Sequence, residues 1–444
     1  MSAAGLVPAL RLAESAGFYD LLDKHLGVGN ANATAKTTSV VGGMLAGADS
    51  IDDLDLLRHG GMGRLFGGIR APSTLGTFLR SFTHGHVQQL DAVGTRLLAG
   101  LTQRVPGLIA GAENTEGVAF IDIDDTVREV HGYAKQGSAY GYTGVRGLNV
   151  QVAAISTPLA APVIAQARLR RGNVASATGA ARMLAQTITT ARAAGVRGQI
   201  MGRADSAFYG HAFVGTAIRH KIWFSVTARM DPKVKATITA IAEDAWTAIK
   251  YPKALWEEDD TVPGGGYWVS DAEVAEISFV AFTGRRKADH VTCRLVVRRV
   301  KRLQPAASDG TAQSVLFATF RHHAFITNTT LSTIEADERH RDHAIIEQVI
   351  AELKDNALAH LPSGSYAANA AWVACAVIAF NIARATAVAA DMAKARWATV
   401  RRKIINTPAR IATTGRRLVL HLPTHWPWAE HWQQLHDTAT ASSG

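Results

Sequence analysis

The sequence predicts an α/β protein whose mixed-sheet core is interrupted by a β-rich insertion and flanked by helical regions. Three observations predict this fold class. Residues 1–112 show helical spacing of apolar side chains, residues 113–230 alternate strand patterns with a helix pattern, and residues 231–320 are rich in strand patterns and tryptophan. A chain of 444 residues also exceeds what one hydrophobic core usually organises, so we expect several domains.

Residues 1–112 are predicted to form a helical N-terminal domain. Residues 51–58 and 88–93 are amphipathic, with apolar side chains at helical spacing. Glycine pairs and Pro72 interrupt the pattern between them, as expected where one helix ends and another begins.

Residues 113–230 are predicted to form the first part of the core. A helix is expected at residues 179–194, because its apolar side chains form one stripe and Gly195 follows it. Apolar runs predict strands on both sides of this helix, at residues 118–124, 148–155, 163–169, 199–204 and 221–226. This order of strands and helix indicates an α/β core with a mixed sheet.

Residues 231–320 are predicted to form the β-rich insertion, with one strand at residues 291–298. Residues 321–444 are predicted to supply the second part of the core and a helical C-terminal region. A strand at residues 324–328 returns to the core, and a long helix at residues 337–354 follows it.

An uncharged stretch at residues 356–383 is long enough to raise the question of a membrane span. However, Pro362 and Asn369 interrupt it, and alanine dominates its composition. We therefore expect a buried helix at residues 365–384 and no membrane partner.

Composition narrows the class of function. The formal net charge of +10 favours a polyanionic partner, nucleic acid before membrane. Only two cysteines are present, which excludes a disulfide framework and a four-cysteine zinc site and fits a reducing compartment. The first residues lack the basic start and apolar block of a secretory signal, so we expect a cytoplasmic, nucleoid-associated protein.

Two aspartates are predicted to stand at strand ends in the core. Asp124 closes the strand at residues 118–124, and Asp205 follows the strand at residues 199–204. Carboxylates at the ends of neighbouring strands can converge, and hard oxygen ligands of this kind suit Mg²⁺ or Mn²⁺. The alternative is that each aspartate caps a helix or stabilises a turn.

Four polar residues of the helix at residues 337–354 share one face. At about 100° per residue, this face is formed by His340, His343, Glu347 and Lys354. Glu352 lies roughly 140° from Glu347 and projects elsewhere. The alternative interpretation is an ordinary solvated face.

The spacing His340-x2-His343-x3-Glu347-x6-Lys354 is similar to the Tyr-x2-Arg-x3-Glu-x6-Lys signature of DDE transposases from bacterial insertion sequences. Asp124-x-Thr126 resembles the first catalytic aspartate of that family. The segment at residues 203–208, which contains Asp205, resembles the second. Within the family, the insertion-sequence 1380 branch is the most similar, since residues 46–53 and 361–364 resemble it as well.

The resemblance implies an RNase H-like core in which Asp124, Asp205 and Glu347 hold two Mg²⁺ or Mn²⁺ ions and catalyse DNA strand cleavage and strand transfer. Lys354 would contact DNA, as would His340 and His343, which replace the tyrosine and arginine of the signature. The implied partner is double-stranded DNA, both the terminal inverted repeats of a transposon and the target. A homodimer is expected in the DNA complex.

Further basic side chains are predicted to bind the DNA backbone. They cluster in the insertion and near the C-terminus, and they are Arg298, Arg299, Lys301, Arg302, Arg401, Arg402 and Lys403. The tryptophans Trp246, Trp256 and Trp268 lie among the first group and suit either base stacking or burial.

Two other functions fit parts of the sequence. A catalytically defective DNA-binding remnant would keep the basic surface and the same motifs. A zinc-dependent hydrolase would use His340, His343 and Glu347, or the pair His322 and His323, as ligands. The hydrolase hypothesis leaves both aspartates unexplained.

Overall fold

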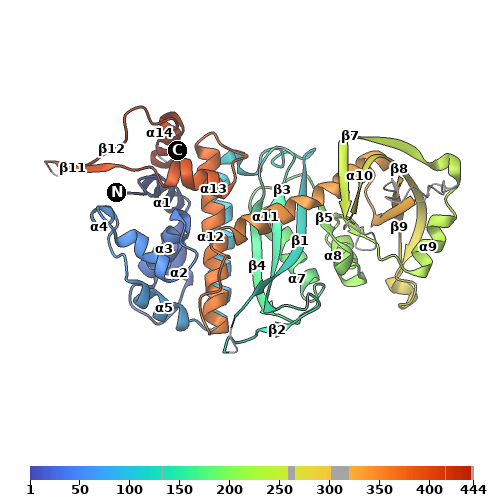
Figure 1. Ribbon diagram of the computed structural model, residues 1–444, viewed down its shortest axis with the longest axis horizontal. Coiled ribbons are helices and arrows are strands. Elements are labelled where there is room, and N and C mark those ends of the chain that lie inside the picture. The colour runs from blue at the N-terminus through green and yellow to red at the C-terminus, as the bar shows by residue number, and fades with distance from the viewer. Residues whose placement is uncertain (132–133, 259–265, 302–319, 416, 442–444) are drawn as a thin grey trace, which may run out of the picture. The chain divides into compact units, whose positions relative to one another are not determined.

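Figure 1 shows the computed structural model, which describes residues 1–444 except 132–133, 259–265, 302–319, 416 and 442–444. The chain divides into two units. The first is formed by Met1–Ile200 together with Ile345–Gly444, and the second is the continuous segment Met201–Ala344. Each unit is described separately.

Helices form the N-terminal part of the first unit, as the spacing of apolar residues predicts. They are α1 (Leu6–Ser15), α2 (Phe18–His25), α3 (Ala33–Ala46), η1 (Asp52–Arg58), α4 (Met62–Leu65), α5 (Pro72–Arg80), α6 (His84–Arg104) and η2 (Pro106–Ile109). The start of α6 is fixed by a reciprocal cap, in which Thr83 and His86 each accept a hydrogen bond from the other's backbone N–H.

A sheet follows in the same unit. Its strands are β1 (Val118–Glu129), β2 (Ala139–Tyr140), β3 (Arg146–Ser156) and β4 (Val163–Arg171). β3 pairs antiparallel with β1, β2 and β4. The helix α7 (Ala180–Ala193) packs against β1, β3 and β4.

The strand β1 is longer than predicted. It continues five residues beyond Asp124 to Glu129, because its pairing with β3 runs without interruption to Glu129 opposite Gly147. Asp124 therefore lies within the strand, opposite Val152, and the prediction that it closes the strand is wrong.

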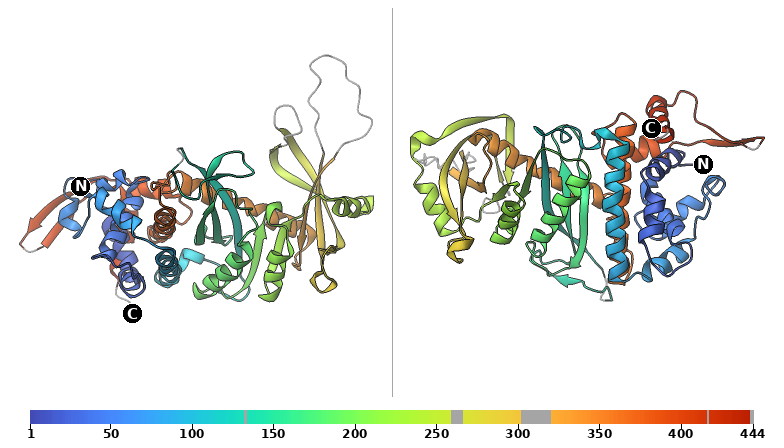
Figure 2. Two further views of the ribbon diagram at one scale, coloured as in Figure 1. Left: turned by 90° about the horizontal axis from the view of Figure 1, so that it is seen from below. Right: turned by 180° about the vertical axis from the view of Figure 1, so that it is seen from behind.

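The C-terminal segment completes the first unit. Its elements are α11 (Ile345–Lys354), α12 (Tyr366–Ala389), α13 (Trp397–Val400), the π-helical turn η7 (Arg401–Ile405), β11 (Arg410–Thr414), β12 (Arg417–His421) and α14 (Ala429–Thr440). The helix α12 runs alongside α6 and also packs against α3 and β4 (Figures 1 and 2).

The helix α12 is the one helix in the described part of the chain that is long and apolar enough to cross a membrane. In this structure 94% of its most apolar window is buried inside the protein. Such burial is typical of a core helix, so the predicted buried helix is confirmed.

The second unit has strands in both parallel and antiparallel pairing. β5 (Gln199–Ala204) carries the chain into it and pairs parallel with β6 (Trp223–Thr227). The remaining pairings are antiparallel and join β6, β10 (Phe320–Thr327), β9 (Val291–Lys301), β8 (Gly266–Ala281) and β7 (Thr247–Glu258). The predictions of an α/β protein and of a mixed sheet are confirmed.

Short helices complete the second unit. They are η3 (Ser206–Phe208), α8 (His211–Arg219), α9 (Pro232–Thr239), η4 (Glu243–Ala245), η5 (Lys287–Asp289), α10 (Thr333–Arg341) and η6 (Asp342–Ala344). The single helix predicted at residues 337–354 is thus divided into α10, the 3₁₀ turn η6 and α11. A 3₁₀ turn winds more tightly than an α-helix, so one face cannot be traced through residues 342–344 at 100° per residue. The prediction that one continuous helix face carries His340, His343, Glu347 and Lys354 therefore does not hold.

Candidate active site

The strand β1 presents carboxylates on both of its faces. Because side chains alternate along a strand, Asp122 and Asp124 point to one face and Asp125 to the other. Asp122 is fully buried and accepts a hydrogen bond from Ser156 Oγ at 3.3 Å. The Asp124 carboxylate is half-buried, and its Oδ1 accepts a hydrogen bond from the backbone N–H of Asp125 at 2.7 Å.

The Asp125 side chain is fully engaged in the structure. It forms an ion pair with Arg170, and it also accepts hydrogen bonds from Asn149 at 2.8 Å and from Ser176 at 3.0 Å. Only 3% of the Asp125 side chain is exposed. Burial lowers the pKa of the Arg170 guanidinium, and the Asp125 charge opposes that shift. Asp125 therefore holds β1 to the segment that precedes α7.

Basic side chains approach β1 from the opposite face, where α11 packs against the strand. Burial lowers the pKa of the Lys354 ammonium, and Arg128 lowers it further, whereas the nearby Asp124 carboxylate raises it. Arg128 lies on the same face of β1 as Asp124, and its Nε donates to the Ala359 carbonyl at 2.7 Å. Asp124, Arg128 and Lys354 thus form one charged cluster.

The two glutamates of α11 have opposite surroundings. Glu352 is 5% exposed and accepts hydrogen bonds from Arg384 and from the backbone N–H of Trp397, both at 2.7 Å. Glu347 is exposed, and no described side chain forms an ion pair with it. Glu347 and Lys354 are seven residues apart, so they lie within about 20° of each other around the helix. Glu347 is therefore on the side of α11 from which Lys354 reaches Asp124.

Asp205 belongs to the second unit. It follows β5, is half-buried and caps the turn η3 by accepting a hydrogen bond from Ala207 N at 2.9 Å. The preceding Arg203 is 1% exposed and donates to the Arg339 carbonyl at 2.6 Å. The capping role that was the alternative interpretation for Asp205 is therefore present.

The two histidines of the motif also belong to the second unit. The His340 ring stacks on Phe325 at a centroid distance of 4.0 Å, and its nitrogens lie 2.8 Å from Ser225 Oγ and 3.0 Å from Thr227 Oγ1. His343 lies in η6 and is half-buried. These contacts give His340 a structural role, and DNA contact by either histidine stays a prediction.

The donor chemistry of the carboxylates fits a divalent cation, because Mg²⁺ and Mn²⁺ prefer hard oxygen ligands. The three candidates are divided between the units, with Asp124 and Glu347 in the first and Asp205 in the second. Among the residues that the structure describes, no group of three or more His, Cys, Asp or Glu side chains is close enough to hold a metal ion.

Two predicted DNA-binding arginines are buried in ion pairs. Arg298 pairs with Asp337 at 3.3 Å. Arg299 pairs with Glu243 and Glu273 and stacks between two aromatic rings, with its guanidinium 4.2 Å from the Trp246 ring centroid and 4.7 Å from that of Phe320. Trp246 is half-buried against Arg299, which favours its structural alternative, and the ion pairs give both arginines a structural role.

The other basic candidates vary in exposure. Lys301 and Arg402 are exposed, whereas Lys403 lies over the Trp428 ring at 4.8 Å. Arg401 donates to Asn356 Oδ1 at 2.5 Å, and burial lowers its pKa. Arg302 and the Trp268 side chain lie outside the described part of the chain, and Trp256 is 46% exposed. DNA contact by this group stays a prediction.

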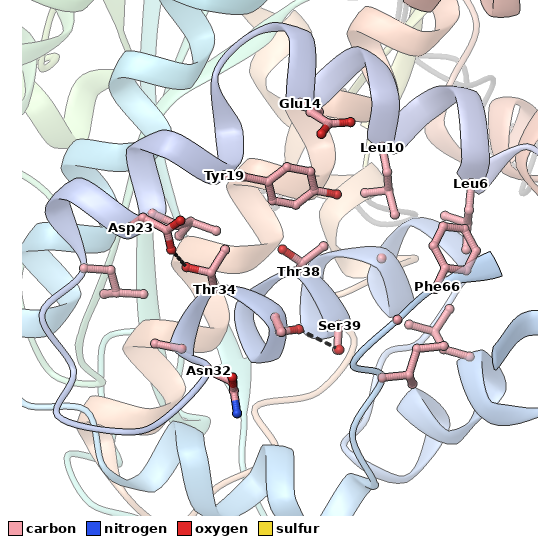
Figure 3. Close-up of a pocket in the computed structure, with 18 of the residues that line it drawn as sticks. Leu6, Leu10, Glu14, Tyr19, Asp23, Asn32, Thr34, Thr38, Ser39 and Phe66 are labelled. Atoms are coloured by element: carbon pink, nitrogen blue, oxygen red, sulfur yellow. Dashed lines mark hydrogen bonds between the residues drawn. The ribbon is translucent and has the colours of Figure 1, made fainter. Parts of the chain in front are cut away.

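Two of the cavities in the described part of the first unit lie away from the charged cluster. One of about 730 Å³ lies between helices of the N-terminal region, with Leu10, Tyr19 and Phe66 in its wall (Figure 3). The other, of about 410 Å³, is lined by Asp91 of α6 and by Gln166 and Arg168 of β4. Burial raises the pKa of the Asp91 carboxyl to about 7, and the Arg168 charge acts in the opposite direction.

Arg128 is the residue of the cluster that sequence reasoning missed. The signal was present, because Asp122, Asp124, Thr126 and Arg128 alternate along β1 and therefore share a face. It was overlooked because the strand was expected to end at Asp124.

Comparison with known families gives one result that spans almost the whole chain. The family model described as transposase DDE domain group 1 matches residues 3–442. The chain belongs to the DDE transposase family. No curated protein matches it.

Membership in the DDE transposase family has direct consequences. It makes the chain an enzyme of the nuclease and strand-transferase kind, with DNA as its partner and divalent metal ions as the usual cofactor of the family. The zinc-hydrolase hypothesis has no support from the family or from the described side chains, since neither His322 and His323 nor His340 and His343 belong to a metal-binding group.

Proposed function

We propose that the chain is a transposase of a bacterial insertion sequence, closest to the insertion-sequence 1380 branch, and that an RNase H-like core brings Asp124, Asp205 and Glu347 together. The observation that carries this proposal is the charged cluster of Asp124, Arg128 and Lys354, which α11 completes from the side that also bears Glu347. The neighbouring acids Asp125 and Glu352 each form an ion pair with an arginine, Arg170 and Arg384 respectively. We therefore do not assign them to the metal site.

The three carboxylates would hold two Mg²⁺ or Mn²⁺ ions. When bound, such ions activate a water or a 3′-hydroxyl and stabilise the leaving oxygen of a phosphodiester. The chain's own cations would bind the substrate. Lys354 places positive charge next to Asp124, and Arg128 lies close to Lys354, so a DNA phosphate would meet less repulsion from the carboxylates. Lys354 would thereby orient the scissile phosphate.

The substrates would be double-stranded DNA, first the terminal inverted repeats of the element and then the target. Two ends must be joined to one target, which favours a homodimer in the DNA complex. The net charge of +10 supports a DNA partner, and we propose a cytoplasmic, nucleoid-associated location.

The test uses purified protein, its element's end sequence and Mg²⁺, with each nick mapped to a nucleotide. Glu347→Gln and Asp124→Asn keep side-chain size but remove a ligand charge, so each should abolish nicking while thermal unfolding and end binding remain near wild type. Glu338→Gln is the matched control, because Glu338 is an exposed glutamate of α10 outside the motif. If the Glu347→Gln variant nicked DNA like the wild-type protein, the proposed triad would be ruled out.

A catalytically defective DNA-binding remnant is the second candidate. The same experiment separates it, because a remnant binds the end sequence but makes no nick with either Mg²⁺ or Mn²⁺. That result would overturn the enzymatic proposal while leaving DNA binding intact.

A further inference from the structure

The strands β11 and β12 form a hairpin that projects from the helices of the first unit (Figures 1 and 2). It belongs to a separate two-stranded sheet. An isolated hairpin of this size is marginally stable in water, so its packing and its partner determine whether it keeps its shape.

One face of the hairpin is anchored to the N-terminal helices. Ile411 occupies the space that a side chain at Gly61 would need, and Thr413 Oγ1 accepts a hydrogen bond from Arg64 at 2.7 Å. The chain that leads into the hairpin is also fixed, because Ala4 N donates to the Thr407 carbonyl at 2.8 Å. This face and the base of the hairpin are therefore held in place.

The other face is basic and exposed. Residues opposite each other in an antiparallel pair share a face, so Arg410 lies beside His421 and Arg417 beside Thr414. All four side chains are exposed. Among the described residues, no carboxylate forms an ion pair with either arginine. Between them lies Val419, which is 37% exposed.

The surrounding sequence contains no negative charge. From residue 392 to residue 429 there is neither aspartate nor glutamate, whereas the same stretch contains eight lysines and arginines. At the base of the hairpin, a hollow of about 560 Å³ is lined by Arg410 and His421 and by uncharged residues. Neither this stretch of sequence nor the lining of the hollow contributes a carboxylate that would repel a polyanion.

We propose that this face of the hairpin, formed by Arg410, Thr414, Arg417, Val419 and His421, is a double-stranded DNA-binding ribbon. A two-stranded β-ribbon fits the major groove of B-DNA, where arginines reach phosphates or guanine edges and an apolar side chain contacts thymine methyl groups. The proposal rests on the proposed function only in taking DNA as the substrate, since the ribbon lies outside the charged cluster at Asp124.

The first test is the salt dependence of binding to a short random-sequence duplex without metal. Each phosphate contact contributes about 0.9 to the slope of log K against log salt, so Arg410→Gln with Arg417→Gln should reduce the slope by about 2. The matched control is Arg11→Gln with Arg80→Gln, which removes equal charge from exposed positions of α1 and α5. An unchanged slope in the hairpin variant, or an equal decrease in the control, would overturn the ribbon.

The second test compares the two faces directly. Both native cysteines are buried, so a cysteine introduced at Val419 or Leu418 is the accessible thiol for a photo-crosslinking reagent. These neighbours are 37% and 48% exposed and point to opposite faces. Val419→Cys should crosslink to duplex DNA several-fold more than Leu418→Cys. Equal yields would contradict the face assignment, and crosslinking of Val419→Cys to a second protein chain instead of DNA would assign the face to a dimer.

These outcomes are independent of the catalytic proposal. If the wild-type protein makes no nick but its binding still depends on Arg410 and Arg417, the ribbon stands and the catalytic proposal fails. If nicking is lost in Glu347→Gln and the hairpin variant binds like wild type, the reverse holds.

Discussion

The two glutamates of α11, Glu347 and Glu352, are five residues apart. They show how one helix can carry a structural carboxylate on one side and a proposed metal ligand on another. The side chain of Glu352 points into the first unit, where Arg384 and the backbone of Trp397 satisfy it. Glu347 points outward on the side of Lys354. The helical periodicity in the sequence predicts that only one of them faces the cluster, but it gives no sign that the other is essential for folding.

Glu352→Gln is expected to destabilise the protein, because it leaves the Arg384 guanidinium buried with no opposite charge. Breaking one partner of a buried ion pair typically costs about 3–5 kcal/mol. Urea unfolding should therefore show a lower midpoint than wild type, and replacing both partners with Glu352→Leu and Arg384→Met should recover part of the loss. A wild-type midpoint for Glu352→Gln would mean that the pair contributes nothing.

Asp91 gives a prediction on pH. Its folded pKa of about 7 lies above the value of an ordinary aspartate, so the folded protein retains the proton while the unfolded chain releases it. Its contribution to stability is therefore present below about pH 4, falls as pH rises and is lost above about pH 7. Asp91→Asn should match wild type at pH 4 and exceed it in unfolding temperature at pH 8. An equal difference at both pH values would contradict this assignment.

At the scale of elements, the existence of strands and helices was predictable, whereas their extents were not. Alternation and apolar runs locate β3, β4, α7 and α12, because these elements bury continuous apolar surface. The length of β1 depends on its pairing with β3, which a single strand's sequence does not contain. The break at residues 342–344 changes the winding over one turn only, and a periodicity measured over many residues does not register it.

The strand β9 shows why a basic sequence need not be a basic surface. Arg298 and Arg299 are adjacent in sequence and point to opposite faces, yet each finds carboxylates on neighbouring segments. Sequence composition cannot distinguish such arginines from exposed ones, because their partners lie 26 to 56 residues away.

Arg299→Ala is expected to lower the stability of the protein by about 2–3 kcal/mol, since it removes two ion pairs and the stacking on Trp246 and Phe320. The salt slope of DNA binding should remain that of wild type. Lys301 lies two residues further along β9 and is exposed, so Lys301→Gln should leave stability unchanged. Parallel chemical unfolding and binding titrations test both; a flattened slope for Arg299→Ala with unchanged stability would restore its predicted role in DNA binding.

At the scale of the whole molecule, net charge and the order of the motifs were sufficient to predict a DNA transposase, and the family match over residues 3–442 agrees. The candidate site was predictable only in part. Asp124 and Lys354 lie in one cluster of the first unit, but the division of the proposed triad between two units does not follow from residue spacing.

Metal removal should separate catalysis from binding in the intact protein. Because the proposed ligands are all carboxylates, Mg²⁺ or Mn²⁺ should support strand cleavage, whereas Ca²⁺ should support binding with little cleavage. A chelator should abolish nicking and leave the binding isotherm of the DNA almost unchanged. Nicking that persists in the chelator would exclude the two-metal mechanism.

The discontinuity of the first unit has a consequence for how the protein is made. Residues 1–200 leave the ribosome well before α12, which fills the core between α6, α3 and β4. The second unit is continuous and complete at residue 344. It can therefore fold before α12, the core helix of the first unit, has been synthesised. At ~5–20 residues per second, the last 100 residues take ~5–20 s to be synthesised. During that interval the unfilled apolar surface is a target for chaperones, and a nascent chain stalled before α12 should be found bound to them.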